Sequence, residues 1–97
     1  MKEIINQLFE IEQKAKNNNI GLFDRNLKRL YHEMETMGYV IKNPENERFS
    51  EERTDIEAKI SGKYQNNMNI SKVLKPIIYK QDGAERILVQ RGIVIVE

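Results

Sequence analysis

The sequence predicts an α+β fold, in which an N-terminal helical hairpin is followed by a small, mainly antiparallel β-domain. The main observation is a change of hydrophobic period, because apolar residues recur at helical spacing up to Gly38 and at strand spacing after it. The length agrees, since 97 residues suffice for one domain or two small units that share an interface. We therefore divide the chain into a helical hairpin (1–38) and a β-domain (39–97).

The first predicted helix covers residues 2–16. Ile5 widens its apolar face, whose other members recur at helical spacing: Ile4, Leu8, Ile11 and Ala15. Three asparagines (17–19) and Gly21 follow, and both residue types tolerate the left-handed backbone that ends helices. The pattern predicts a helix end at this point.

The second predicted helix covers about 22–37. Its apolar residues are separated by 4, 3, 4 and 3 positions: Phe23, Leu27, Leu30, Met34 and Met37. This alternation is typical of the seam of a coiled coil or four-helix bundle. Two short helices cannot enclose such a seam alone, so we expect a homodimer whose interface combines these residues with Ile4, Leu8 and Ile11. The alternative is that the seam packs on the chain's own β-domain.

Two short strands are predicted after Gly38. Residues 39–41 are apolar and are ended by Asn43 and Pro44. In the second strand Ile56, Ala58 and Ile60 alternate with charged residues, which indicates a half-buried strand. A polar loop (62–69) follows it.

The end of the chain is richer in apolar residues. Segment 70–80 has helical spacing, but Pro76 near its middle and its many β-branched residues favour a strand, with the proline at an edge or bulge. A turn at 81–83 leads into segment 87–97, which is nearly all apolar. We expect one final strand there, covered on both faces, with a bulge at Gly92.

Composition argues against several functional classes. The 16 basic and 15 acidic residues are interspersed, so no basic stripe predicts nucleic-acid binding. No apolar run approaches the roughly 20 residues that span a bilayer, and acids interrupt the N-terminal apolar stretch, so we expect neither a membrane segment nor a signal peptide. The expectation is a cytoplasmic protein. Without cysteine and with only His32, no metal site or cofactor is expected.

No catalytic motif is apparent, so we do not expect an enzyme. The acids at 51–52, 55 and 57 could form a general acid/base pair, but such acids are common on solvated loops. Recognition of another protein is the remaining function. Phe49 lies in a polar loop, either packed under that loop or presented to a partner, with Glu47, Arg48 and Arg53 as a polar rim. Three lysines of the β-domain face an acidic partner or protect a sheet edge: Lys72, Lys75 and Lys80.

The order of these pieces resembles GrpE, the nucleotide exchange factor of DnaK-type chaperones. Segment 20–41, IGLFDRNLKRLYHEMETMGYVI, looks like the family's last bundle helix, which ends in a glycine before a short strand, as at Gly38. NERF (46–49) is similar to the family's Gly-Glu-x-Phe, and Glu57 and Ala58 stand where the family has His-Glu-Ala. ILVQRGIVIVE, with Arg91, is similar to the closing strand.

The chain also departs from the family pattern. Asn46 replaces a glycine, Ser50 and Glu51 replace Asp-Pro, and the residue before Glu57 is not the family's histidine. The interval from Phe49 to Glu57 is about two residues longer than in the family, and the family's long N-terminal helix has no counterpart, so contacts through it are not expected.

The resemblance implies a homodimeric four-helix bundle that carries β-domains. One β-domain would bind the ATPase domain of a DnaK-type chaperone and promote ADP release. By position, Gly38 would set the junction between bundle and β-domain, while Glu47, Phe49, Glu57, Ala58 and Arg91 would shape the contact surface. No cofactor, nucleic acid or membrane is implied. The alternative is a dimeric adaptor that binds a protein partner without exchange activity.

Overall fold

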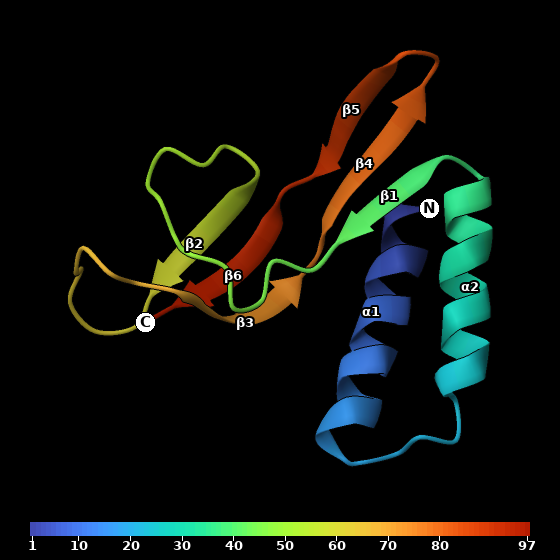
Figure 1. Cartoon of the computed structure of the whole chain (residues 1–97), viewed down its shortest axis with the longest axis horizontal. Coiled ribbons are helices and arrows are strands. Elements are labelled where there is room, and N and C mark those ends of the chain that lie inside the picture. The colour runs from blue at the N-terminus through green and yellow to red at the C-terminus, as the bar shows by residue number, and fades with distance from the viewer.

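The computed structural model describes residues 1–97 as two helices followed by six strands in two three-stranded sheets (Figure 1). The elements are α1 (Lys2–Asn17), α2 (Asp24–Thr36), β1 (Tyr39–Lys42), β2 (Ile56–Ile60), β3 (Ile70–Lys75), β4 (Ile77–Asp82), β5 (Glu85–Gln90) and β6 (Gly92–Val96). The predicted α+β fold class is therefore confirmed. The molecule is flat, with principal extents of 39 × 38 × 18 Å.

The helices form an antiparallel pair that packs on the β-domain, with α1 against β3 and α2 against β1 (Figure 1). α1 ends at Asn17, and the left-handed backbone of Asn19 (φ 55°) turns the chain, as the run of asparagines predicted. The phenol of Tyr31 on α2 donates a 3.1 Å hydrogen bond to Glu12 on α1. Neither helix is long and apolar enough to cross a membrane.

The two sheets have the strand orders β1-β4-β5 and β2-β6-β3. All pairs are antiparallel except β2 with β6, in which Ala58 lies opposite Val94 in parallel register. One long hairpin crosses both sheets: β3 and β6 form its base, and β4 and β5 form an arm that points away (Figure 1).

The strand predicted for 70–80 is real, but one continuous strand was the wrong prediction. The chain leaves one sheet at Lys75 and enters the other at Ile77, with Pro76 buried between them. Proline has no N–H for a ladder hydrogen bond, so the ladder is interrupted at the point where the hairpin changes sheets. The opposite side of the hairpin breaks at the same level, at Arg91.

The prediction of a single strand over 87–97, covered on both faces, was therefore also wrong. Val94 and Val96 of β6 are fully buried, but Ile87, Leu88 and Val89 of β5 are 48%, 39% and 38% exposed. Gly92 is not a bulge; it begins β6, where an added Cβ would lie 2.9 Å from Cγ1 of Ile77. The register shifts lie instead within β3 and between β4 and β5.

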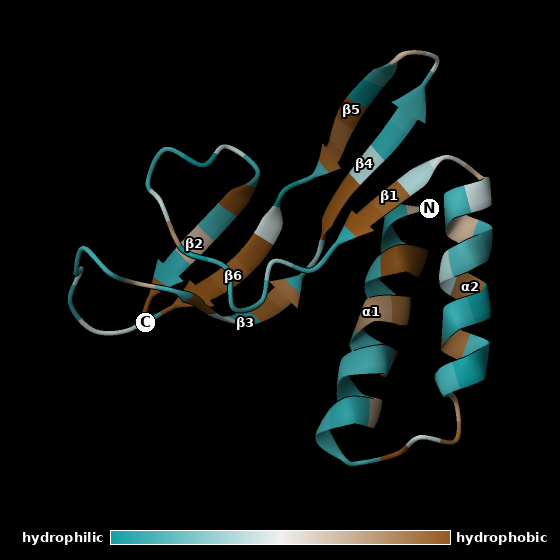
Figure 2. Cartoon of the chain, viewed as in Figure 1, coloured by the Kyte–Doolittle hydropathy of each residue, from teal (hydrophilic) through white to brown (hydrophobic).

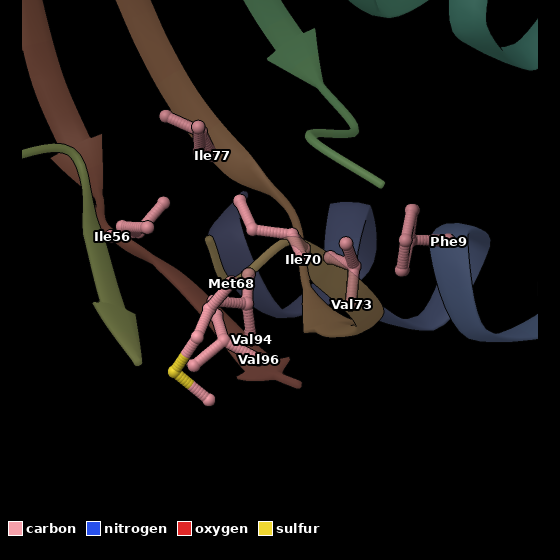
Figure 3. Close-up of a cluster of buried hydrophobic side chains, with 8 residues drawn as sticks. All are labelled: Phe9, Ile56, Met68, Ile70, Val73, Ile77, Val94 and Val96. Atoms are coloured by element: carbon pink, nitrogen blue, oxygen red, sulfur yellow. The ribbon is translucent and has the colours of Figure 1, made fainter. Parts of the chain in front are cut away.

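Two clusters of buried side chains hold the chain together. The larger lies in the β-domain and includes Phe9 of α1 (Figure 3): Phe9, Ile56, Met68, Ile70, Val73, Ile77, Val94 and Val96. The smaller lies between the helices and the β1-β4-β5 sheet: Ile5, Leu8, Leu27, Met34 and Ile78. Both clusters join the two sides of Gly38, so helices and β-domain share their core.

A side-chain amide pair also ties α1 to the bend of the hairpin. Asn6 and Gln90 exchange two hydrogen bonds of 2.8 Å, and the Gln90 amide also donates to the Pro76 carbonyl at 2.8 Å. This pair satisfies polar groups that the change of sheet would otherwise leave unpaired.

Candidate functional site: a concavity beside strand β2

A concavity with a volume of about 630 Å³ lies beside β2, an edge strand. The loop between β1 and β2 forms one wall, and the start of β6 forms the other. Its lining includes four of the six residues that carry the resemblance to GrpE: Phe49, Glu57, Ala58 and Arg91. The others are Glu51, Arg53, Ile56, Lys59 and Ile93.

Phe49 is held by the backbone of its loop. Its N–H donates to the Met68 carbonyl at 3.0 Å, and the neighbouring Arg48 forms an isolated β-bridge with Asn69. The side chain is half-buried against the larger core cluster while it also lines the concavity. Phe49 therefore combines the two placements that the sequence left open, since one part packs inside and another is available to a ligand.

Arg53 organises the charged wall of the site. Its guanidinium donates two hydrogen bonds of 3.0 Å to Asp55 and one of 3.1 Å to Glu47. The hydrogen bonds from Arg53 hold the pKa of Asp55 below its usual range, and they raise the pKa of Arg53 itself. Glu47 reaches the site only through this contact. Arg48, predicted as part of the rim, instead donates to Asn67.

Arg91 closes the opposite side. Its guanidinium donates a 2.6 Å hydrogen bond to the Ile56 carbonyl and lies 3.5 Å from the Glu57 carboxylate. The break between β5 and β6 positions it, because the next residue, Gly92, already lies opposite Ile56 of β2 and donates a 2.9 Å hydrogen bond to the carbonyl of Asp55, just before that strand. Arg91 thus links the change of sheet to the site.

Gly38 lies apart from this concavity, at the junction of α2 and β1. Its φ of 92° favours glycine. The N–H of Gly38 donates a hydrogen bond to the Glu35 carbonyl, and the carbonyl of Gly38 accepts one from the N–H of Gln81. The ammonium group of Lys80 lies 4.3 Å from the ring centroid of Tyr39 and donates to the Met37 carbonyl beside it. Gly38 therefore shapes the junction, and it is not part of the concavity.

The predicted seam of the helices splits into two rows. Leu8, Leu27 and Met34 are buried within the chain. The other five positions remain about half exposed, between 46% and 58%: Ile4, Ile11, Phe23, Leu30 and Met37. Along α2 the buried and exposed residues alternate at the 4-and-3 spacing, because consecutive seam residues point to opposite sides of the seam.

The exposed row borders a second, apolar groove between the two helices, with a volume of about 360 Å³. Its lining comes from both helices: Glu3, Ile4, Gln7, Leu8, Ile11, Leu30 and Met34. Figure 2 shows that apolar residues on α1 and α2 are interspersed with hydrophilic ones. We call the five exposed seam residues the outer row.

The chemistry of the concavity suits binding. Its polar groups are carboxylates, guanidinium groups and one lysine, and five of the charged side chains around it already take part in ion pairs: Glu47, Arg53, Asp55, Glu57 and Arg91. His32 is exposed on α2, and no group of three or more potential ligands is placed to hold a metal ion. Lys59 and Ile93 were missed by sequence reasoning; their alternation with inward-facing neighbours was the available signal.

In comparisons with known proteins, no protein-family model matches the chain, and neither a curated protein nor a solved structure matches it.

Proposed function

We propose that this chain is a GrpE-like co-chaperone that acts in the cytoplasm. In this proposal a homodimer presents its β-domain to the ATPase domain of a DnaK-type chaperone and promotes ADP release. The main support is that Phe49, Glu57, Ala58 and Arg91, which are scattered over the sequence, line one concavity. All four carry the resemblance to GrpE, and only Glu57 and Ala58 are neighbours in the sequence.

The loop before Phe49 gives a second point of support. Asn46 stands where the family has a glycine, and its φ of 70° is a left-handed conformation that asparagine tolerates better than most residues. The backbone requirement that a glycine would meet is therefore met by Asn46. Its N–H donates to the Ile70 carbonyl at 2.8 Å, which holds the loop against β3.

The homodimer is supported by the outer row. Five half-exposed apolar side chains follow the seam of the two helices, and three of them, Ile4, Ile11 and Leu30, line one apolar groove. A second copy related by a two-fold axis would set its outer row against this one and complete a four-helix core. Each copy would then retain one β-domain at the side of the bundle.

Exchange of this kind makes and breaks no bond in the factor, so the proposed activity is not enzymatic. A factor that binds the open nucleotide cleft of the chaperone better than the closed one lowers the affinity of the chaperone for nucleotide. By the same coupling free energy, bound nucleotide lowers the affinity of the chaperone for the factor. Couplings of about 1–3 kcal/mol correspond to a roughly 5- to 150-fold weakening of nucleotide affinity. The concavity is suited to such selective binding because it combines an apolar floor with charged walls.

An adaptor without exchange activity is the second candidate. The loop between Phe49 and Glu57, which is longer than in the GrpE family, favours the adaptor. Two residues of this loop, Glu51 and Arg53, line the concavity. The longer loop alters the surface that a chaperone would contact. Both candidates use the same concavity and the same dimer.

Release of a fluorescent ADP analogue from a DnaK-type chaperone of the same source tests the proposal. We expect dose-dependent acceleration by the chain, and loss of acceleration in Glu57→Lys, which reverses an exposed charge in the concavity. Glu45→Lys is the matched control, because Glu45 is exposed in the neighbouring loop and does not line the site. A folded dimer that gives no acceleration at any concentration would refute exchange activity and favour the adaptor.

A further inference from the structure

The outer face of the β2-β6-β3 sheet forms another exposed surface of the β-domain. Side chains of a strand alternate between its faces, and in β6 Val94 and Val96 point into the core. Ile93 and Ile95 therefore point outward, where they remain half-buried. Since β6 is the central strand, these two isoleucines form an apolar ridge along the middle of the face.

Lysines flank this ridge on both sides. On β3, Lys75 lies opposite Ile93 and Lys72 lies opposite Ile95; on β2, Lys59 lies opposite Ile95. All three lysines are exposed, and none forms an ion pair with an acidic side chain.

Acidic groups on this face are fewer. Glu57 lies opposite Ile93, but its carboxylate is 3.5 Å from the guanidinium of Arg91, at the start of the ridge. Glu97 follows the end of β6. The face is therefore positive although the whole chain carries a formal net charge of only +1. Lys80, which the sequence grouped with Lys72 and Lys75, belongs to the other sheet and contacts Tyr39.

We propose that this face binds an acidic protein segment, with two aliphatic side chains on the isoleucine ridge and carboxylates beside the flanking lysines. Lysine is suited to this arrangement, because its aliphatic stem covers apolar surface while its ammonium group remains at the rim. Such charge complementarity attracts the partner and sets its register.

The same features argue against other occupants. A second copy that presented this face would set lysine against lysine. A nucleic acid would need a longer array of cations and aromatic side chains for stacking, whereas this face offers a few cations and aliphatic isoleucines. An acidic protein segment matches both the charge and the apolar ridge.

This inference rests on the proposed function only in taking the β-domain as the part that contacts a partner. It adds the chemistry of the partner surface, and it extends the site beyond the concavity, with which it shares Glu57, Lys59, Arg91 and Ile93.

Nuclear magnetic resonance of the full ¹⁵N-labelled chain tests the proposal. The probe is a synthetic heptapeptide that alternates glutamate with valine and isoleucine, and the control peptide has lysine in place of glutamate. We expect the acidic peptide to shift amide signals of residues 57–59, 72–75 and 91–95, and we expect the basic peptide to leave them unchanged. Raising the salt concentration from 0.05 to 0.5 M should weaken the binding, because exposed charges are screened.

Two double variants identify the lysines that matter. Lys72→Glu with Lys75→Glu should weaken peptide binding at least about fivefold, as expected when two surface ion pairs are lost. Lys2→Glu with Lys28→Glu changes the net charge equally, at exposed positions on the two helices, and should retain binding. Circular dichroism of both variants verifies that they fold.

Several outcomes would overturn the inference. These are shifts confined to the helices, equal weakening in both double variants, or binding of phosphatidylserine vesicles or single-stranded RNA with no effect of the acidic peptide. The ADP-release assay reports separately on the proposed function. If the chain binds the acidic peptide but does not accelerate ADP release, exchange activity is refuted and the ridge is supported. If the chain accelerates ADP release but does not bind the peptide, and the Lys72→Glu, Lys75→Glu variant accelerates release equally, the ridge is refuted and exchange activity is supported.

Discussion

Truncation of Leu30 to alanine gives the sharpest test of the proposed dimer, because Leu27 offers a matched control on the same helix. Both residues are leucines of the predicted seam, three positions apart. Leu27 is 6% exposed and packs in the smaller core cluster, whereas Leu30 is 46% exposed and belongs to the outer row. The same chemical change therefore removes buried atoms at one position and exposed atoms at the other.

The expected magnitudes differ accordingly. Leucine to alanine removes three carbon atoms, each worth about 0.8 kcal/mol when it passes from water to a buried site. Because Leu30 is 46% exposed, dimer formation would bury about half of its side chain and gain about half of this free energy. The loss is about 1 kcal/mol per copy, or about 2 kcal/mol for a symmetric dimer, which raises the dimer dissociation constant about 30-fold.

At Leu27 the cost falls on the fold of the single chain. Truncation of a buried leucine destabilises a protein by about 2–5 kcal/mol, since a cavity remains in addition to the lost transfer free energy. In a domain of this size each kilocalorie lowers Tm by about 4–8 °C, so we expect a decrease of about 10 °C or more. Leu30→Ala should change the unfolding of the dissociated chain by less than about 0.5 kcal/mol.

Sedimentation equilibrium over a range of protein concentrations measures the dissociation constants. Thermal unfolding at concentrations below dissociation separates the stability of the chain from that of the dimer, because association itself raises Tm. A wild-type protein that stays monomeric at all concentrations would refute the dimer. Equal destabilisation of the single chain by both substitutions would show that Leu30 belongs to the intrachain core.

Three further predictions concern the junctions around the two surfaces. Gln90→Leu leaves the amide of Asn6 without its partner and should cost about 1–3 kcal/mol, measured as a lower urea midpoint; an unchanged midpoint would show that the amide pair does not hold the bend. Asp55→Asn removes the pairing with Arg53. Because that pairing lowers the pKa of Asp55, its stabilisation is complete above the unfolded pKa of about 4 and is lost as pH falls through the lower folded pKa. The stability gap between wild type and Asp55→Asn should therefore close as pH falls below about 4, and a gap that widens towards acid would contradict this. Gly38→Ala places a side chain at a φ of 92° and should cost about 1 kcal/mol in chemical denaturation, whereas a stabilised variant would show that the junction relaxes freely.

The helical part was predictable because its signals are local. The run of asparagines ends α1 where expected, and the 4-and-3 spacing on α2 marks residues that are all at or near the helix seam. Spacing alone could not separate the two rows of that seam. Leu27 and Leu30 differ only in which side of the helix pair they face, and this depends on where α1 and the β-domain pack.

The β-domain was predicted as a set of strands, but its division into two sheets was not. Pro76 was correctly seen to disrupt a helix, yet the matching break at Arg91 has no proline to indicate it. The break at Arg91 is a consequence of the break at Pro76 on the opposite strand, because a hairpin that passes from one sheet to another must do so with both of its strands. Phe9 and Met68 were missed as core residues for a related reason, because each enters the β-domain core from outside the β-sheets.

The change of sheet also connects the two proposed binding surfaces. Arg91 is placed by the break in the hairpin, and from there it reaches the Ile56 carbonyl and the Glu57 carboxylate. The same break begins β6, whose alternation puts Ile93 on the outer ridge and Val94 in the core. A partner that occupied the concavity and the ridge together would therefore contact both sides of this corner. Gln90, the residue before the corner, exchanges two hydrogen bonds with Asn6 of α1, so the same corner is also held to the helix pair.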